Sequence, residues 1–360
     1  MPLYTNPAEF VIDLINTDFS HDSTTAQQRL THLHTSWATS PAAASLTANI
    51  RAAAETASST PITSSPTASN TPTSALHTTL TLTHRSFLKS HRDIVAYGIR
   101  IAMYLGLAIM MGTVWLRLSP TQSNIQAFTN AIFFGGAFMS FMAVAYIPAY
   151  LEDLAIYSKE RANGLYGPTA FMLSNFVVGV PYLFLITILF SVVSYWLGNF
   201  RPGADGFWMW VLWLFLDLLA AESLVVLLSS LIPIFVVALA ATAFANGLWM
   251  CVNGFMVQPD TLNVFWRYVF HYIDYQAYVF RGMMVNEFGK RSYECERLEG
   301  GGCQCMYPSA LQEQCLVDGK AVLAVYGFGT GHTGKYVGYL LVIVVVYRLL
   351  GWAVLYLRKH

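Results

Sequence analysis

The chain has 360 residues, of which 55% are hydrophobic and only 11% are charged. Soluble domains carry about 25% charged residues, and a soluble core of this size could not bury so much apolar surface, so the composition indicates an integral membrane protein. The net charge is zero, with 20 basic and 20 acidic residues, which argues against nucleic acid as a partner.

The first part of the chain is polar. Residues 1–20 carry apolar side chains at helical spacing and predict a short amphipathic helix, with Asn6 or Thr5 as its N-cap. Residues 21–80 are rich in Ser, Thr, Ala and Pro and have few large apolar residues, which predicts a disordered linker. From Leu82 onwards, basic and apolar residues alternate as in a helix that lies on a membrane surface.

A transmembrane helix needs about 20 consecutive apolar residues. Six segments meet this condition and predict an all-α membrane domain over residues 81–360. The expected spans are residues 96–116, 126–147, 170–197, 206–230, 234–257 and 336–357. Arg100 lies near one end of the first span, where its long side chain can reach the membrane surface.

A seventh apolar stretch, residues 262–280, is too polar to span the membrane. Its polar residues are Arg267, His271, Asp274 and Arg281. Irregular backbone at membrane depth must be covered by protein, so this stretch predicts a re-entrant or interfacial segment.

Basic residues near the spans predict the orientation of the chain. Three precede the first span and two follow the last, so both termini are expected on the cytoplasmic side of the plasma membrane. These residues are Arg85, Lys89, Arg92, Arg358 and Lys359. The loop over residues 148–168 is then cytoplasmic, and the long loop over residues 281–335 is external.

Four of the five cysteines cluster in the long external loop, at Cys295, Cys303, Cys305 and Cys315. Disulfides persist in oxidising compartments, whereas zinc is disfavoured because the cluster has no CxxC pair and no nearby His; no metal site is expected. Cys303 and Cys305 are too close to pair readily with each other. The open pairings are Cys295–Cys303 with Cys305–Cys315, Cys295–Cys305 with Cys303–Cys315, or a bridge to a second subunit.

Two carboxyl side chains, Asp217 and Glu222, lie inside the fourth expected span. A charge at the bilayer centre costs about 2.5–3.5 kcal/mol on insertion scales. Each carboxyl group therefore either holds helices together as a hydrogen-bonded or protonated group, or serves as a proton relay near a transport path. Their spacing places them about 140° apart around a helix, so they are not expected to act as one pair.

The second and fifth expected spans each present a distinctive face. The residues are Phe134, Phe138 and Phe141 in one, and Asn246, Met250 and Asn253 in the other. Both faces fit ordinary helix packing. Both also fit a cavity for a flat apolar ligand that offers a few polar groups.

The loop over residues 148–168 mixes acidic and basic residues and ends at Gly164, Gly167 and Pro168. It predicts either a solvated surface helix or a coupling helix that docks on a soluble motor domain. The sequence has no GxxxxGK[ST] phosphate loop. We therefore expect no ATP binding by this chain itself.

Several short segments, taken in order, resemble the membrane domain of G-subfamily (White-type) ABC transporters. They are Asn6–Phe10 with Asp13, Arg85–Phe87, Arg92–Asp93, Arg100, Gly112–Val114, Glu160–Arg161, Gly164–Tyr166, Glu222–Leu224, Gly254–Phe255 and Phe265–Tyr268. The resemblance covers about residues 1–20 and 82–360, and the last three segments are most similar to lipid-exporting members.

The resemblance implies a half-transporter that forms a homo- or heterodimer. ATP and Mg²⁺ would bind a nucleotide-binding domain that lies in cis, before the membrane domain, or acts in trans, and residues 1–20 would be its tail or a linker helix. The resemblance also implies site residues. They are a coupling helix with Asp153, Glu160 and Arg161, a substrate cavity of Phe138, Phe141, Ala243, Asn246, Gly247 and Met250, and an exit plug of Phe255 and Met256.

The expected function is that of an ABC-type translocase, which exports lipid-like or other hydrophobic compounds at the expense of ATP. The bulky plug and Phe138 favour an apolar substrate. One alternative is a proton-coupled secondary transporter that uses Asp217 or Glu222. Another is a fragment that transports nothing and regulates full-length partners.

Overall fold

The computed structural model describes residues 6–17, 23–59, 74–93, 97–298 and 302–358. The chain divides into two units, Met1–Thr71 and Pro72–His360. Each unit is described by itself below. Residues 60–73 of the expected linker lie outside the described residues. So does Lys359, which was used to predict the orientation of the chain.

The first unit contains three helices, α1 (Pro7–Ile15), α2 (Ser23–Ala38) and α3 (Pro41–Ser59). The side chain of Asn6 caps α1 by accepting a 3.0 Å hydrogen bond from the Ala8 amide, which confirms the predicted helix with Asn6 as its N-cap. Thr5, the alternative cap, lies outside the described residues. The helices α2 and α3 differ from the disordered linker predicted there. Ala has the highest helix propensity of all residues, and the hydroxyl groups of Thr31 and Thr35 bond to carbonyls four residues earlier.

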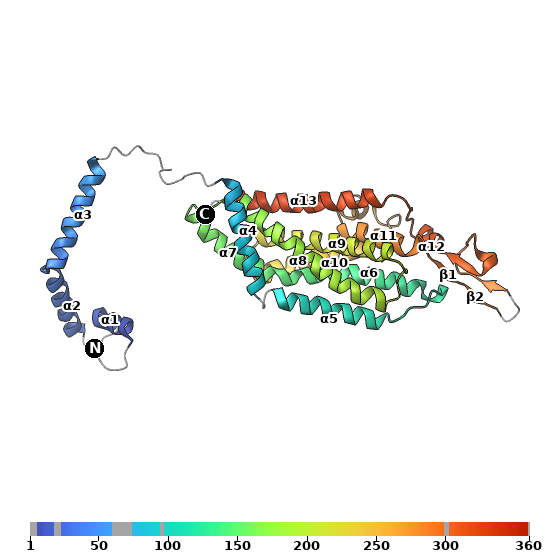
Figure 1. Cartoon of the computed structure of the whole chain (residues 1–360), viewed down its shortest axis with the longest axis horizontal. Helices are drawn as coiled ribbons and strands as arrows, with labels where there is room; N and C mark the ends of the chain where they lie inside the picture. Colours follow the sequence, from blue (N-terminus) through green and yellow to red (C-terminus); the bar gives the residue numbers. More distant parts are fainter. Residues whose placement is uncertain (1–5, 18–22, 60–73, 94–96, 299–301, 359–360) are drawn as a thin grey trace. The chain divides into compact units, whose positions relative to one another are not determined.

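The second unit is built around a bundle of apolar helices that run side by side (Figure 1). They are α5 (Ile99–Val114), α6 (Ile125–Met142), α8 (Pro168–Leu197), α9 (Ala204–Leu231), α10 (Phe235–Val252) and α13 (Thr333–Leu357). Five helices in the described part of the chain are long and apolar enough to cross a membrane, and α5 is a shorter apolar helix of 16 residues.

The helix α9 lies at the centre of the bundle, with most of its side chains buried. Trp213 of α9 is fully buried and packs against Gly282 of α11 (Tyr275–Phe288). A Cβ atom at Gly282 would lie 2.2 Å from the Trp213 ring. Glycine is therefore what allows α11 to approach α9 so closely.

The second expected span lies within a continuous apolar helical stretch, Gln122–Ala162, that changes its winding. The helix α6 stops at Met142, and a 3₁₀ turn over Ala143–Tyr146 leads into α7 (Ile147–Ala162). Pro148 occupies the first turn of α7, where the missing amide proton costs nothing. The helix predicted in the loop over residues 148–168, whether as a surface or a coupling helix, is thus present as α7, which has 16 residues.

One end of the bundle carries α4 (Ala75–Arg92) and α7, and the opposite end carries the β-strands (Figure 1). We call these the α7 end and the strand end. At the strand end, β1 (Ser292–Glu294) pairs antiparallel with β4 (Leu316–Asp318), and β2 (Glu296–Arg297) pairs antiparallel with β3 (Cys303–Gln304). The remaining short elements are the 3₁₀ helices Gln122–Asn124 and Gln312–Gln314, the π-helix Trp266–His271 and α12 (Gly319–Val325).

Candidate functional site

Ion pairs connect α4 to α7. The Arg85 guanidinium donates two hydrogen bonds to the Glu160 carboxylate, at 2.6 and 3.0 Å, and Tyr166 donates a third. Lys89 contacts Asp153 at 2.7 Å and also reaches the neighbouring acid of α7. Exposed ion pairs contribute about 0–1 kcal/mol to stability, but a bidentate pair fixes orientation, so these contacts set how α4 lies on α7.

The third residue expected in the coupling helix points elsewhere. Arg161 donates hydrogen bonds to the main-chain carbonyl groups of Leu355 and Tyr356 in α13, and to the hydroxyl group of Tyr157. The helix α7 is thus bonded to α4 through Asp153 and Glu160, and to α13 through Arg161.

A narrow cleft leads from the α4–α7 contact into the bundle, with Lys89 and Asp153 at its mouth and Arg100 and Glu222 within it. Arg100 of α5 donates a 2.7 Å hydrogen bond to Glu222 of α9, and their side chains are 3% and 2% exposed. The Arg100 guanidinium also lies over the Tyr146 ring, 4.7 Å from its centroid. The prediction that Arg100 extends to the membrane surface was wrong, because Glu222 neutralises its charge inside the bundle.

The polar contacts continue into α8 and α13. Arg348 of α13 donates to the Ser223 hydroxyl at 3.0 Å and to the Asn175 amide oxygen at 2.8 Å. Asn175 in turn donates to the Tyr146 hydroxyl at 2.6 Å. Because buried polar groups are costly when left unpaired, these bonds hold the helices in one arrangement.

Asp217 faces away from Glu222, in agreement with the predicted angle between them. It accepts a 2.8 Å hydrogen bond from Ser140 of α6, and its Oδ1 atom has no partner within the described residues. Asn246 lies close by, buried, and accepts a 2.8 Å hydrogen bond from Tyr275. Asn246, one of the expected cavity residues, therefore joins α10 to α11 inside the bundle.

The other residues of the expected cavity lie on the outer faces of α6 and α10. Phe138 is half-buried and stacks on Phe134 with 5.6 Å between ring centroids, whereas Phe141 is 41% exposed. Ala243, Gly247 and Met250 are partly exposed on α10. Phe244, which the sequence analysis missed, is 74% exposed beside them.

The two residues of the expected exit plug differ in their surroundings. Phe255 stacks on Phe133 of α6, with ring centroids 4.1 Å apart, and contacts Phe280 of α11 edge to face. Met256, the next residue, is exposed. Phe255 thus closes the strand end of the α6–α11 contact.

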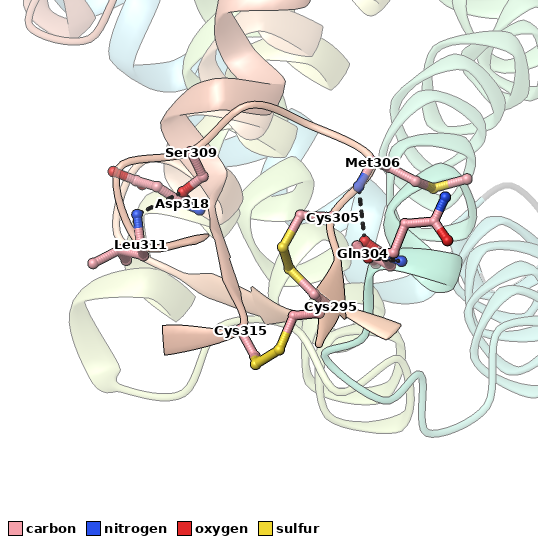
Figure 2. Close-up of a disulfide and its surroundings, with 10 residues drawn as sticks. Cys295, Gln304, Cys305, Met306, Ser309, Leu311, Cys315 and Asp318 are labelled. Carbon is pink, nitrogen blue, oxygen red and sulfur yellow. Dashed lines mark hydrogen bonds between the residues drawn. A yellow bond between two sulfur atoms is a disulfide. The ribbon is translucent and has the colours of Figure 1, made fainter. Parts of the chain in front are cut away.

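Two disulfides, Cys295–Cys305 and Cys303–Cys315, cross-link the loop at the strand end (Figure 2). This is the second of the pairings left open by the sequence. Gln122, just before α6, donates to the Gln304 carbonyl and accepts from the Met306 amide, both at 2.9 Å. The disulfide-bonded loop is therefore attached to the bundle.

A buried carboxylate anchors the base of this loop. Glu287 of α11 accepts hydrogen bonds from Arg291 at 2.6 Å, from the Arg201 amide at 2.7 Å and from the Tyr293 hydroxyl at 3.2 Å. Burial raises the pKa of Glu287, and the Arg291 charge opposes that rise. The sequence showed Glu287 as one acid among several and gave no sign of this role. The described residues contain no group of three His, Cys, Asp or Glu side chains placed to hold a metal ion.

Comparison with known proteins gives a consistent assignment. The family described as ABC-2 type transporter matches residues 77–288. ABC transporter G family member 1 of Petunia hybrida is 31% identical over 210 residues, which cover 58% of this chain and 33% of the relative. ABC transporter G family member 5 of Arabidopsis thaliana is 27% identical over 285 residues, which cover 79% and 42%.

The matched region thus covers less than half of the length of these relatives. Family member 11 of Arabidopsis thaliana is similar, with 30% identity over 219 residues that cover 61% of this chain and 31% of the relative. The family match begins in the first turn of α4 and runs to the end of α11. The chain belongs to the ABC-2 type transporter family, and its bundle is a transporter membrane domain homologous to those of ABC transporter G family members.

Proposed function

We propose that the chain is the membrane half of an ATP-driven exporter of lipid-like or other hydrophobic compounds. It would work as a homo- or heterodimer, with nucleotide-binding domains supplied in cis or in trans. The observation that carries the proposal is that α7 is bonded to α4 by surface ion pairs and lines one cleft with the buried Arg100–Glu222 pair. A motor that moves α7 would pull on these contacts and so on the bundle.

The proposal includes six spans, with both termini cytoplasmic and the strand end external. The helix α5 would be the sixth span, although its 16 residues extend only about 24 Å against the roughly 30 Å of hydrocarbon in a bilayer. The π-helix and the start of α11 would form the re-entrant segment. Disulfides at the strand end support an external position, because they persist in oxidising compartments.

The substrate path would lie between two copies of the outer face of α6 and α10. Phe141 and Phe244 expose large apolar surfaces there, and an exposed apolar patch marks an interaction site or a ligand groove. Asn246 and Asp217 lie behind this face and hold its helices in place. A cavity of this composition selects apolar compounds and offers few polar contacts.

Co-expression of the full chain with nucleotide-binding domains of G-family transporters tests the proposal. The purified complex, in lipid nanodiscs, should hydrolyse ATP faster when a lipid-like substrate is added, and vanadate should abolish the stimulation. Failure of the chain to associate with any such domain would exclude the proposal.

A further inference from the structure

A polar cavity of about 230 Å³ lies at the strand end of the bundle, outside the contacts described above. Its walls come from the segment that follows α10, from the π-helix, from the first turns of α11 and from the turn after α12. The residues that matter are Asp260, Arg267, His271, Tyr278, Arg281 and Tyr326. One water molecule needs about 10–15 Å³ of such space, so the cavity has room for a larger group.

The π-helix brings its polar residues to one side. Arg267 and His271 are nearly one turn apart in this winding, and both reach the cavity. The other side of the same segment is apolar and open. Val264, Phe265, Tyr268 and Val269 are all exposed. The segment is thus amphipathic, with a polar face toward the cavity and an apolar face toward its surroundings.

The charges in the cavity do not balance. Arg267 forms a 2.8 Å ion pair with Asp260, whose side chain is 79% exposed. Arg281 has no carboxylate within 4.0 Å in the described part of the chain. Its partners are the Tyr336 hydroxyl at 3.1 Å and the face of the Phe328 ring, 4.7 Å from the guanidinium.

His271 offers no negative charge to offset the arginines. Its Nδ1 atom lies 2.7 Å from the Val252 carbonyl oxygen, which can only accept, so Nδ1 carries a proton and donates this bond. Burial lowers the pKa of His271, and the nearby Arg281 and Arg267 charges lower it further. Two guanidinium groups and one carboxylate leave the cavity with one uncompensated positive charge.

We infer that this cavity binds an oxyanion, a phosphate or carboxylate group, carried as the head of an amphiphile whose hydrocarbon tail lies on the exposed apolar side of the π-helix segment. Guanidinium groups are suited to phosphate and carboxylate because their donors match the geometry of these oxyanions. The open apolar face beside the cavity favours an amphiphile over a free ion. The site stands apart from the proposed transport function, because binding here requires neither ATP nor a second copy.

Binding to the full chain in micelles of a neutral maltoside detergent, which carries neither phosphate nor carboxylate, tests the inference directly. The probes are dodecyl phosphate, dodecanoate, inorganic phosphate and the neutral dodecanol, measured by isothermal titration. Both charged amphiphiles should bind, dodecanol should bind at least about tenfold more weakly, and Arg281→Gln should weaken the charged probes by a similar factor, since a hydrogen bond to a charged group is worth about a factor of ten or more. Arg297→Gln, which changes an exposed arginine of β2, should bind as the wild type does.

Two results on the wild-type chain alone overturn the inference, so it does not depend on the folding of a variant. One is equal binding of dodecanol and dodecyl phosphate, which would show a purely apolar groove. The other is no binding of either charged amphiphile. Inorganic phosphate that binds as tightly as dodecyl phosphate would overturn the assignment of a tail. If Arg281→Gln fails to fold, Arg281→Lys takes its place. This variant keeps the positive charge and should retain part of the affinity for the charged amphiphiles.

Discussion

Arg100 of α5 and Glu222 of α9 form an ion pair of 2.7 Å inside the apolar bundle, with both side chains almost fully buried. Breaking a buried pair by removing one partner leaves an unpaired charge and costs about 3–5 kcal/mol. We predict that Glu222→Ala lowers the free energy of unfolding by that amount, measured by thermal unfolding in detergent. The double variant Arg100→Leu/Glu222→Leu should be more stable than Glu222→Ala.

The control for this prediction is Glu152→Ala, which removes a 60% exposed partner of Lys89. Exposed pairs contribute about 0–1 kcal/mol, so this variant should unfold nearly as the wild type does. A Glu222→Ala protein as stable as Glu152→Ala would contradict the role of the buried pair.

The α4–α7 ion pairs should matter for coupling far more than for stability. Arg85→Glu places two like charges opposite each other and should change the free energy of unfolding by about 1 kcal/mol or less. We expect it to reduce substrate-stimulated ATP hydrolysis severalfold in the complex with nucleotide-binding domains. The exchanged variant Arg85→Glu/Glu160→Arg should recover much of the stimulation. An equal loss of stimulated ATP hydrolysis in both variants would show that the ion pair between these residues is not needed for coupling.

The disulfides at the strand end should be found as Cys295–Cys305 and Cys303–Cys315 by peptide mapping under non-reducing conditions. Removing one, as in Cys303→Ser/Cys315→Ser, should cost about 2–5 kcal/mol and open the loop to proteases, because a disulfide restricts the unfolded chain. Cys251→Ser, at the free and exposed cysteine of α10, should change neither property. Mapped Cys295–Cys303 and Cys305–Cys315 bridges would contradict the structure.

Gly282 should not tolerate a methyl group. A Cβ atom there would meet the buried ring of Trp213 at 2.2 Å, and overpacking a tight core costs about 1–3 kcal/mol. Gly282→Ala should lower the melting temperature accordingly. Gly106→Ala, where no atom lies within 4 Å of the added carbon, should leave it unchanged or slightly raised. Similar melting temperatures for both variants would refute the close contact.

A substitution of Asp217 distinguishes ATP-driven export from proton-coupled transport. Its contact is with Ser140, and Asn can accept the same hydrogen bond. We predict that Asp217→Asn keeps both the rate of export and its dependence on pH. A loss of pH dependence in this variant would instead support a proton relay, and with it the secondary transporter considered from the sequence.

The sequence predicts the positions of the apolar helices well, because length and hydropathy decide them. The expected span at 206–230 corresponds to α9 (Ala204–Leu231), and that at 170–197 to α8 (Pro168–Leu197). The sequence did not predict the change of winding after Met142, because the 3₁₀ turn over Ala143–Tyr146 is as apolar as the helix before it. Hydropathy has no signal for a change of winding.

Contacts between distant residues are what the sequence leaves undecided. Arg100 and Glu222 are 122 positions apart, and no local pattern shows that they pair. Asn246 shares a helical face with Met250, yet it bonds to Tyr275 inside the bundle. The cysteine pairing likewise depends on the pairing of strand β2 with strand β3. Strands of two residues leave no recognisable pattern in a sequence.

Export measured in proteoliposomes that contain the chain and its nucleotide-binding domains tests the central claim most directly. A fluorescent lipid analogue is followed across the membrane with ATP, with ATP and vanadate, and with a pH gradient alone. The account predicts movement with ATP, none with vanadate, and none with the pH gradient alone. Movement driven by the pH gradient and insensitive to vanadate would contradict it.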